Sequence, residues 1–207
     1  VPQGLVVLGL VTVVGGITAF ARFFDAFVDP AVASLSDRCD SKAGRRMPFL
    51  KFAALPLAVV TVLVFWSPIN GTSWVNAAFL FVTVIGYYIA LTFYCTPYNA
   101  LIAELGHDSK QQLTISTAIS FTWVAGTAIA YVAPVIWGAF VPMMGRITAI
   151  RVTFTIMAAV AFACMLVPPL AIREKDYVNS QPTSESTIES LKQTFSDGEF
   201  RKFVCSD

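Results

Sequence analysis

Five long apolar stretches dominate the first 172 residues of this 207-residue chain. A helix needs about 20 residues to cross a hydrocarbon core, and each stretch is long enough to do so. The mean hydropathy of +0.69 lies outside the normal range of a soluble domain. The sequence therefore predicts an all-α, multi-pass integral membrane protein. The stretches cover approximately residues 5–35, 47–66, 74–96, 113–137 and 147–172.

Basic residues are distributed unevenly between the two sides of these stretches. On one side there are seven, whereas Arg146 and Arg151 are the only two on the other. The positive-inside rule makes the seven-residue side cytoplasmic, in the plasma or inner membrane of the cell. Trp66, Trp74 and Trp137 fall at the predicted outer ends, where an aromatic belt would place them. The seven cytoplasmic residues are Arg38, Lys42, Arg45, Arg46, Lys110, Arg173 and Lys175.

The order of the stretches predicts a fragment of a larger protein. An odd number of crossings would start the chain outside, and it begins with Val1 instead of Met. We therefore expect residues 1–172 to be an amino-terminal helix bundle whose first helix is missing. Residues 173–198, which are polar and rich in Ser, Thr and Glu, are expected to be a cytoplasmic linker, and residues 199–207 the start of a carboxy-terminal bundle.

The charges deepest inside the apolar stretches are Arg22, Asp25 and Asp29. Their spacing of three and then four residues places them on one face of a helix. A charge at the centre of a membrane helix costs roughly 2.5 to 3.5 kcal/mol on insertion scales. Counted back from the cytoplasmic edge, Asp25 lies on the order of 16 Å deep, near the midplane. This cost indicates a functional polar site.

Two carboxylates one turn apart in a medium of low dielectric constant repel each other unless a cation compensates them. Asp25 and Asp29 therefore favour a site that exchanges protons or sodium ions. In the alternative interpretation, Arg22 and one aspartate form a static ion pair that orients the helix. Two acids and one base still leave a carboxylate for a cation.

Other function classes lack support in the sequence. The single histidine, His107, falls in a predicted loop without a nucleophile partner, and the four cysteines form no CxxC or His/Cys pattern. We therefore expect no enzyme, no cofactor and no metal beyond a sodium ion at Asp25 and Asp29. Without a basic tract that contains aromatic residues, no nucleic-acid partner is expected either. The expected partners are the lipid bilayer, a small-molecule solute and the missing carboxy-terminal half.

The loop after the first stretch carries a second group of charges, in the order Ser-Asp-Arg, a spacer and Gly-Arg-Arg. This order resembles the loop between the second and third helices of the major facilitator superfamily. The resemblance implies a gating loop that holds the cytoplasmic side closed in the outward-open state, with Asp37 and Arg38 as its pivotal pair. The gating residues are Asp37, Arg38, Lys42, Gly44, Arg45 and Arg46.

Within that superfamily, residues 21–30 resemble the second helix of the glycoside-pentoside-hexuronide:cation symporters. The Arg, the Asp three residues on and the Asp-Pro four beyond that all match. Residues 44–49 and 97–101 also match the family's patterns. The resemblance implies the major facilitator fold, with the five stretches as the second to sixth of twelve helices.

In the melibiose-permease-like members of this family, two aspartates of the second helix bind the coupling cation together with a Thr and an Asp of the fourth. The matching residues here are Asp25, Asp29 and Thr92, but the fourth-helix acid is Cys95. The resemblance therefore implies a cation site of two carboxylates and a hydroxyl, with Arg22 as charge partner. It leaves H⁺ and Na⁺ open as the coupling ion.

Candidates for contacts with a solute are fewer. Asn99 stands where these symporters have an aromatic residue, and Trp123 lies in the fourth stretch, where it could stack on a flat ligand or serve packing. The small residues at positions 118, 122, 126 and 130 are expected to pack against another helix.

The predicted function is cation-coupled symport of a sugar, a glycoside or a similar solute by alternating access. Two alternatives remain: symport of a non-sugar solute such as a lipid, or a transport-inactive sensor or scaffold of the same fold. A half-molecule has no second bundle to rock against, so by itself it is not expected to transport.

Overall fold

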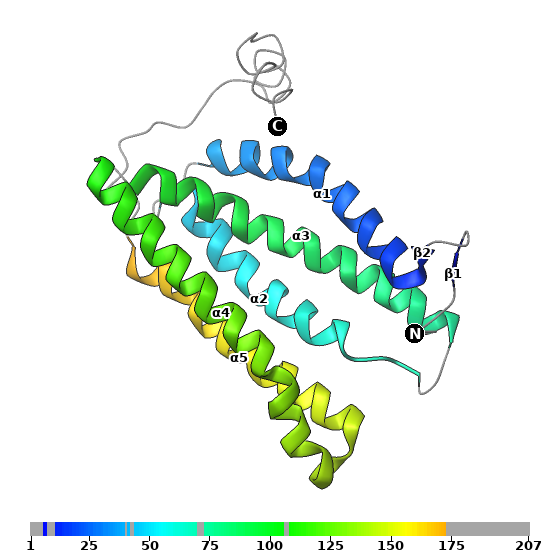
Figure 1. Cartoon of the computed structure of the whole chain (residues 1–207). Helices are drawn as coiled ribbons and strands as arrows, with labels where there is room; N and C mark the ends of the chain where they lie inside the picture. The colour runs from blue at the N-terminus through cyan, green and yellow to red at the C-terminus, as the bar shows by residue number, and fades with distance from the viewer. Residues whose placement is uncertain are drawn as a thin grey trace.

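The computed structural model describes residues 6–7, 11–39, 41, 44–69, 73–105 and 108–172. Its helices lie side by side and alternate in direction along the chain, so α1 and α3 run the same way (Figure 1). The predicted all-α architecture is confirmed. The expected linker at 173–198 and the expected second bundle at 199–207 lie outside the described residues, as do Lys42 and His107. The helices are α1 (Val13–Asp37), α2 (Met47–Val64), α3 (Trp74–Leu105), α4 (Ser109–Met144) and α5 (Arg146–Ala171).

The start of the first apolar stretch differs from the prediction. We predicted one helix over residues 5–35, but two short antiparallel strands, β1 (Val6–Val7) and β2 (Val11–Thr12), precede α1. Three of these four residues are valine and the fourth is threonine. All four are β-branched, which favours extended backbone over helix. The helix itself begins at Val13.

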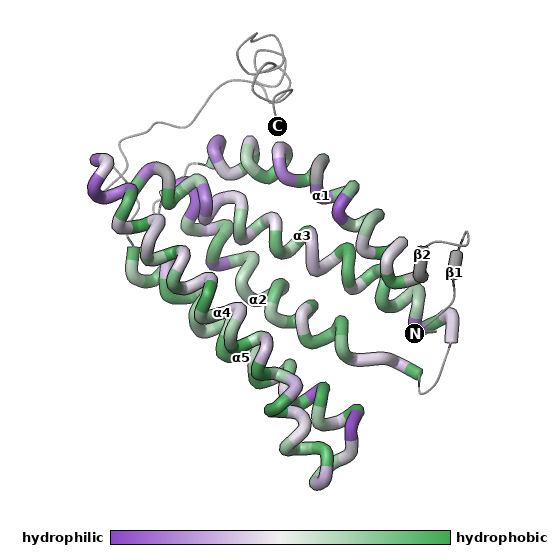
Figure 2. The backbone as a smooth tube through the Cα atoms, viewed as in Figure 1, coloured by the Kyte–Doolittle hydropathy of each residue, from purple (hydrophilic) through white to green (hydrophobic). Residues whose placement is uncertain are grey.

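Within the described residues, α2, α3, α4 and α5 are long and apolar enough to cross a membrane. This confirms four of the five predicted spans. Helix α1 does not meet the same measure of length and composition, because it contains Arg22, Asp25 and Asp29. Figure 2 shows hydrophobic residues along α4 and α5 and hydrophilic residues near their ends, as expected of helices in contact with lipid.

Two helices are longer than predicted. Helix α3 continues through Pro97 to Leu105, beyond the predicted end at residue 96, and α4 extends from Ser109 to Met144 instead of covering 113–137. A proline removes one backbone hydrogen bond, but helices in membranes tolerate it where neighbouring groups satisfy the freed carbonyl. The extra turns of α3 carry Glu104 to the predicted cytoplasmic end of the bundle.

Helix α3 lies between α1 and α2, and α2 packs in turn against α5 (Figure 1). The buried core at these contacts contains small residues such as Ala53, Ala54 and Ala90, which let the helix backbones approach closely. Tyr94 of α3 reaches across the core and its hydroxyl donates a 2.9 Å hydrogen bond to the carbonyl of Met165 in α5. The helices therefore contact one another in the order α1–α3–α2–α5–α4.

At the predicted outer end, Arg151 joins α5 to the end of α2. Its Nη2 donates a 3.1 Å hydrogen bond to the carbonyl of Ser67, and its guanidinium carbon lies 5.3 Å from the centroid of the Trp66 ring. The rings of Phe65 and Phe154 stack beside them with centroids 3.6 Å apart. These contacts place Arg151 and Trp66 on the same side of the bundle, as the predicted topology requires.

Candidate functional site

The charged face of α1 lies against α3. The Thr92 hydroxyl of α3 donates a 2.5 Å hydrogen bond to Oδ1 of Asp25, whose other oxygen, Oδ2, lies 3.9 Å from Nη1 of Arg22. The Asp25 side chain is only 18% exposed. Both of its oxygens therefore have a partner, and the structure brings together three of the residues that the resemblance assigned to a cation site.

One turn further along, the same two helices make a second contact of this kind. The Thr96 hydroxyl donates a 3.2 Å hydrogen bond to Oδ1 of Asp29, which is exposed. Our sequence analysis missed Thr96. The signal was present, because Thr92 and Thr96 are separated by the same four residues as Asp25 and Asp29.

Arg22 has a second neighbour on α3 that the sequence analysis did not find. Its guanidinium carbon lies 4.8 Å from the centroid of the Tyr88 ring. A guanidinium over an aromatic face gains about 0.5 to 2 kcal/mol, depending on its solvation. This contact holds the Arg22 side chain near Asp25, although that side chain is 67% exposed. Arg22 and Asp25 balance each other in charge, which leaves Asp29 as the additional acid.

Cys95 lies on α3 between the two threonines in sequence, within electrostatic reach of both Asp25 and Asp29. It supplies a thiol, which is a soft ligand, where the family resemblance led us to look for a third carboxylate. Within the described residues, no group of three or more His, Cys, Asp and Glu side chains gathers to hold a metal ion. The oxygen donors at this site are thus two carboxylates and two threonine hydroxyls.

Three of the predicted gating residues, Asp37, Arg45 and Arg46, form an ion-pair network with Glu104 at the predicted cytoplasmic end. Arg46 Nη2 donates a 3.0 Å hydrogen bond to Asp37 Oδ1, and Arg45 Nη2 donates one of 3.1 Å to Glu104 Oε1. Arg46 Nη1 lies 2.9 Å from Glu104 Oε2, close enough for an ion pair but not aligned as a hydrogen bond. The Arg45 and Arg46 side chains are only 10% and 6% exposed. The network therefore joins α1, the loop before α2 and the end of α3.

Glu104 is the member of this network that sequence reasoning missed, because it lies 59 residues after Arg45. Gly44 has a backbone φ of 116°, which residues with a Cβ atom rarely adopt. This explains why the loop has a glycine at this position. Of the expected pivotal pair, Asp37 pairs with Arg46, and Arg38 is exposed directly after the end of α1.

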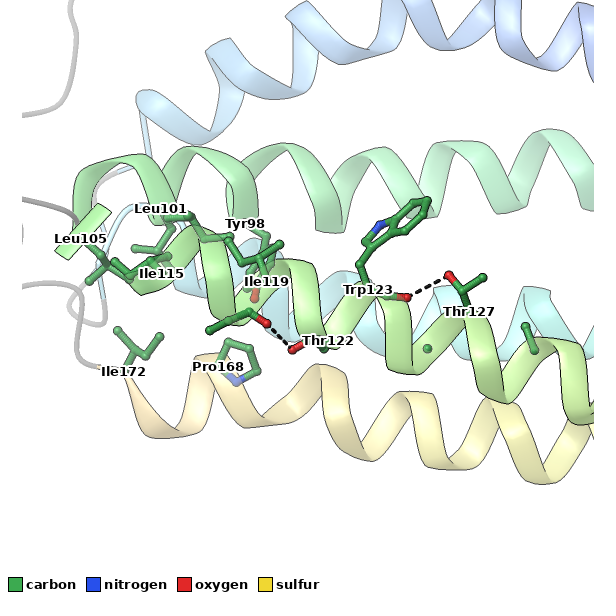
Figure 3. Close-up of a pocket in the computed structure, with 14 residues that line it drawn as sticks. Tyr98, Leu101, Leu105, Ile115, Ile119, Thr122, Trp123, Thr127, Pro168 and Ile172 are labelled. Atoms are coloured by element: carbon green, nitrogen blue, oxygen red, sulfur yellow. Dashed lines mark hydrogen bonds between the residues drawn. The ribbon is translucent and has the colours of Figure 1, made fainter. Parts of the chain in front are cut away.

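The solute candidates lie apart from each other. Trp123 forms part of the wall of a cavity of about 720 Å³ between α3, α4 and α5, together with residues such as Tyr98 and Pro168 (Figure 3). Its side chain is highly exposed. Asn99 is exposed on α3 and does not line this cavity. Of the two solute candidates, only Trp123 therefore lines this cavity.

The expectation that the small residues of α4 pack against another helix is wrong for the described residues. Ala118, Thr122, Gly126 and Ala130 line the same cavity as Trp123. A Cβ added at Gly126 would meet no atom within 4 Å. Small side chains leave space as readily as they permit close packing, and here α4 packs against α5 with little contact to α3.

Comparison with known proteins identifies the family. The sequence profile described as "MFS/sugar transport protein" matches residues 6–207. The chain belongs to this family. This match confirms the predicted major facilitator fold. The family and the apolar helices together also confirm an integral multi-pass protein of the cell membrane. A family of transport proteins also agrees with the expectation of a transporter instead of an enzyme.

The relatives of this chain include a symporter, a transporter and a carrier protein homolog. The inner membrane symporter YicJ of Escherichia coli (strain K12) is 27% identical over 194 residues, which are 91% of this chain and 40% of that protein. The isoprimeverose transporter of Lactiplantibacillus pentosus is 27% identical over 117 residues, 56% of this chain and 24% of the relative. The glucuronide carrier protein homolog of E. coli is 26% identical over 104 residues, 50% of this chain and 23% of the relative. The chain spans less than half the length of each of these proteins.

Proposed function

We propose that the full-length protein is a secondary active transporter that couples the movement of a sugar or glycoside to a monovalent cation. The observation that carries this proposal is the α1–α3 contact, in which Asp25 and Asp29 accept hydrogen bonds from two threonine hydroxyls next to membrane-length helices. Acids within the membrane are costly and mark ion or proton pathways in membrane proteins. The names of the relatives, a symporter and a sugar transporter among them, support the same function.

In this proposal the cytoplasmic network is the gate. Arg45, Arg46, Asp37 and Glu104 hold α1 and α3 together at one end while the cation site faces the other side. Alternating access then requires the two bundles of the full-length protein to rock against each other. The chain alone is proposed not to transport. Uptake by cells that express only these 207 residues, blocked by an uncoupler, would contradict this.

The proposal is tested by reconstituting the full-length protein in proteoliposomes and measuring solute-driven pH change and sodium-22 uptake with a panel of glycosides. Coupled flux of either ion supports a symporter and names the ion. The absence of any flux with every solute in the panel would favour the transport-inactive alternative.

Cys95→Asp tests which features of the site select the ion. A carboxylate at this position adds hard oxygen ligands beside Asp25 and Asp29, which suits a sodium ion. We expect the Na⁺ concentration that gives half-maximal uptake to fall about tenfold relative to Cys95→Asn, the uncharged variant of the same shape. Uptake measured over a series of Na⁺ concentrations checks this. Identical Na⁺ dependence in the two variants would show that position 95 does not contact the ion.

Trp123→Ala tests the cavity in Figure 3 as the place of the solute. Stacking on an aromatic ring contributes about 1 kcal/mol, so we expect the KM for the solute to rise about fivefold, with the dependence on the cation unchanged. Tyr131→Ala, on an exposed part of α4 that does not line the cavity, is the control. An unchanged KM in Trp123→Ala would place the solute elsewhere.

A further inference from the structure

Most helical hydroxyl groups with a described hydrogen bond donate within their own helix, but those of Thr92 and Thr96 donate to another helix. A threonine or serine in a helix usually donates to the carbonyl four residues before it, which satisfies the hydroxyl within its own helix. Thr92 and Thr96 instead donate across the helix interface to Asp25 and Asp29. The residues that follow the common pattern are Thr18, Thr61, Thr83, Thr114, Thr117, Ser120, Thr122, Thr127 and Thr155.

The two contacts share one register. Thr92 lies 67 residues after Asp25, and Thr96 lies 67 residues after Asp29. Because α1 and α3 run in the same direction, a step of one helical turn on α1 is matched by a step of one turn on α3. The packing that places Thr92 at Asp25 therefore also places Thr96 at Asp29.

The turn of α3 that carries Thr96 has a further acceptor. Pro97 follows directly and has no N–H, so it cannot donate the helical hydrogen bond to the carbonyl of Phe93. A hydroxyl and a backbone carbonyl that lacks its usual donor thus occur within one turn of the helix. Oxygen atoms of these types are ligands that hard monovalent cations accept.

The charged and titratable groups around this turn come from both helices. Arg22 and Asp25 lie on α1, and Tyr87, Tyr88 and Cys95 lie on α3. Arg22 is held at Asp25 and at the Tyr88 ring. Asp29 has Thr96 as its hydrogen-bond donor on α3, and it is more exposed than Asp25.

We propose that Thr96 belongs to the cation site as a second hydroxyl, which orients the Asp29 carboxylate and supplies an oxygen to a bound monovalent cation. The Thr96 hydroxyl supplies a hard oxygen ligand directly after Cys95, whose thiol is a soft ligand. This inference rests on the proposed function, because it assigns a new residue to the same site.

Thr96→Val tests the inference in the full-length protein, since valine keeps the shape of threonine and removes the hydroxyl. We expect the cation concentration for half-maximal uptake to rise about tenfold, read as Na⁺ dependence at fixed pH and as the pH profile without Na⁺. The maximal rate at saturating cation stays within about twofold. Thr96→Ser, which keeps the hydroxyl, restores the wild-type cation dependence.

Thr83→Val is the matched control, because Thr83 lies on the same helix and donates only within it, to the carbonyls of Phe79 and Leu80. An unchanged cation dependence in Thr96→Val would overturn the inference, as would an equal change in Thr83→Val. Failure of the proposed function looks different: wild-type uptake would then show no cation dependence at all, or Asp29→Asn would leave it unaltered.

Discussion

Asp29→Asn and Asp25→Asn are each expected to abolish cation-driven accumulation of the solute by the full-length protein. Asn has nearly the shape of Asp but no charge, so the site loses a charged ligand while the packing of α1 against α3 is retained. A hydrogen bond or contact to a charged group contributes about 1.5 to 3 kcal/mol, which corresponds to a loss of roughly 10- to 100-fold in ion affinity. Accumulation in proteoliposomes under an imposed pH or Na⁺ gradient measures this effect.

Exchange of labelled for unlabelled solute, which needs no ion gradient, is expected to continue in both variants. This separates a lost coupling site from a protein that has not folded. Asp108→Asn, on an exposed acid before α4, is the matched control and should accumulate solute like the wild type. If both Asp25→Asn and Asp29→Asn retain ion-driven accumulation, the charged face is a static ion pair, as the alternative interpretation holds.

The second large effect is expected for Glu104→Gln at the predicted cytoplasmic end. Glu104 is the carboxylate that Arg45 and Arg46 share, and both guanidinium groups are largely buried. Removing one partner of a buried ion pair costs about 3 to 5 kcal/mol, and the partial exposure of Glu104 lowers this to about 2 to 3 kcal/mol. A loss of this size should lower the population of the closed arrangement at this end by a factor of about ten or more.

Cys39, two residues beyond Asp37, is a natural reporter of this change. We expect a membrane-impermeant maleimide added from the cytoplasmic side to label Cys39 at least several-fold faster in Glu104→Gln, as read by peptide mass spectrometry. Lys51→Gln, a charge-removing change at an exposed position of α2, should label at the wild-type rate. Equal labelling in Glu104→Gln and the wild type would show that the network does not hold this end closed.

The sequence predicted the helices well because apolar length and helical spacing are local properties. The face formed by Arg22, Asp25 and Asp29 follows from the helical repeat, and the resemblance named Thr92 as their partner across the interface. The start of α1 was predicted too early, since hydropathy does not distinguish an apolar strand from an apolar helix at residues 6–12.

The partners on other helices were harder to predict. Thr96, Tyr88 and Glu104 meet the charged residues of α1 and the loop only through the register of two helices that are about 60 residues apart in sequence. Periodicity shows which residues share a face, but not which face of another helix lies opposite. The small residues of α4 illustrate the same limit, because an alanine or glycine stripe is compatible both with close packing and with the wall of a cavity.

The measurement that tests the central claim most directly is solute-driven ion flux in proteoliposomes, with wild-type full-length protein compared with the double variant Asp25→Asn/Asp29→Asn. We predict that addition of a transported glycoside drives H⁺ or Na⁺ across the membrane in the wild type and drives neither ion in the double variant, although solute still crosses. Solute-driven ion flux of equal size in both proteins would contradict the account, because the coupling site would then lie away from the α1–α3 carboxylates.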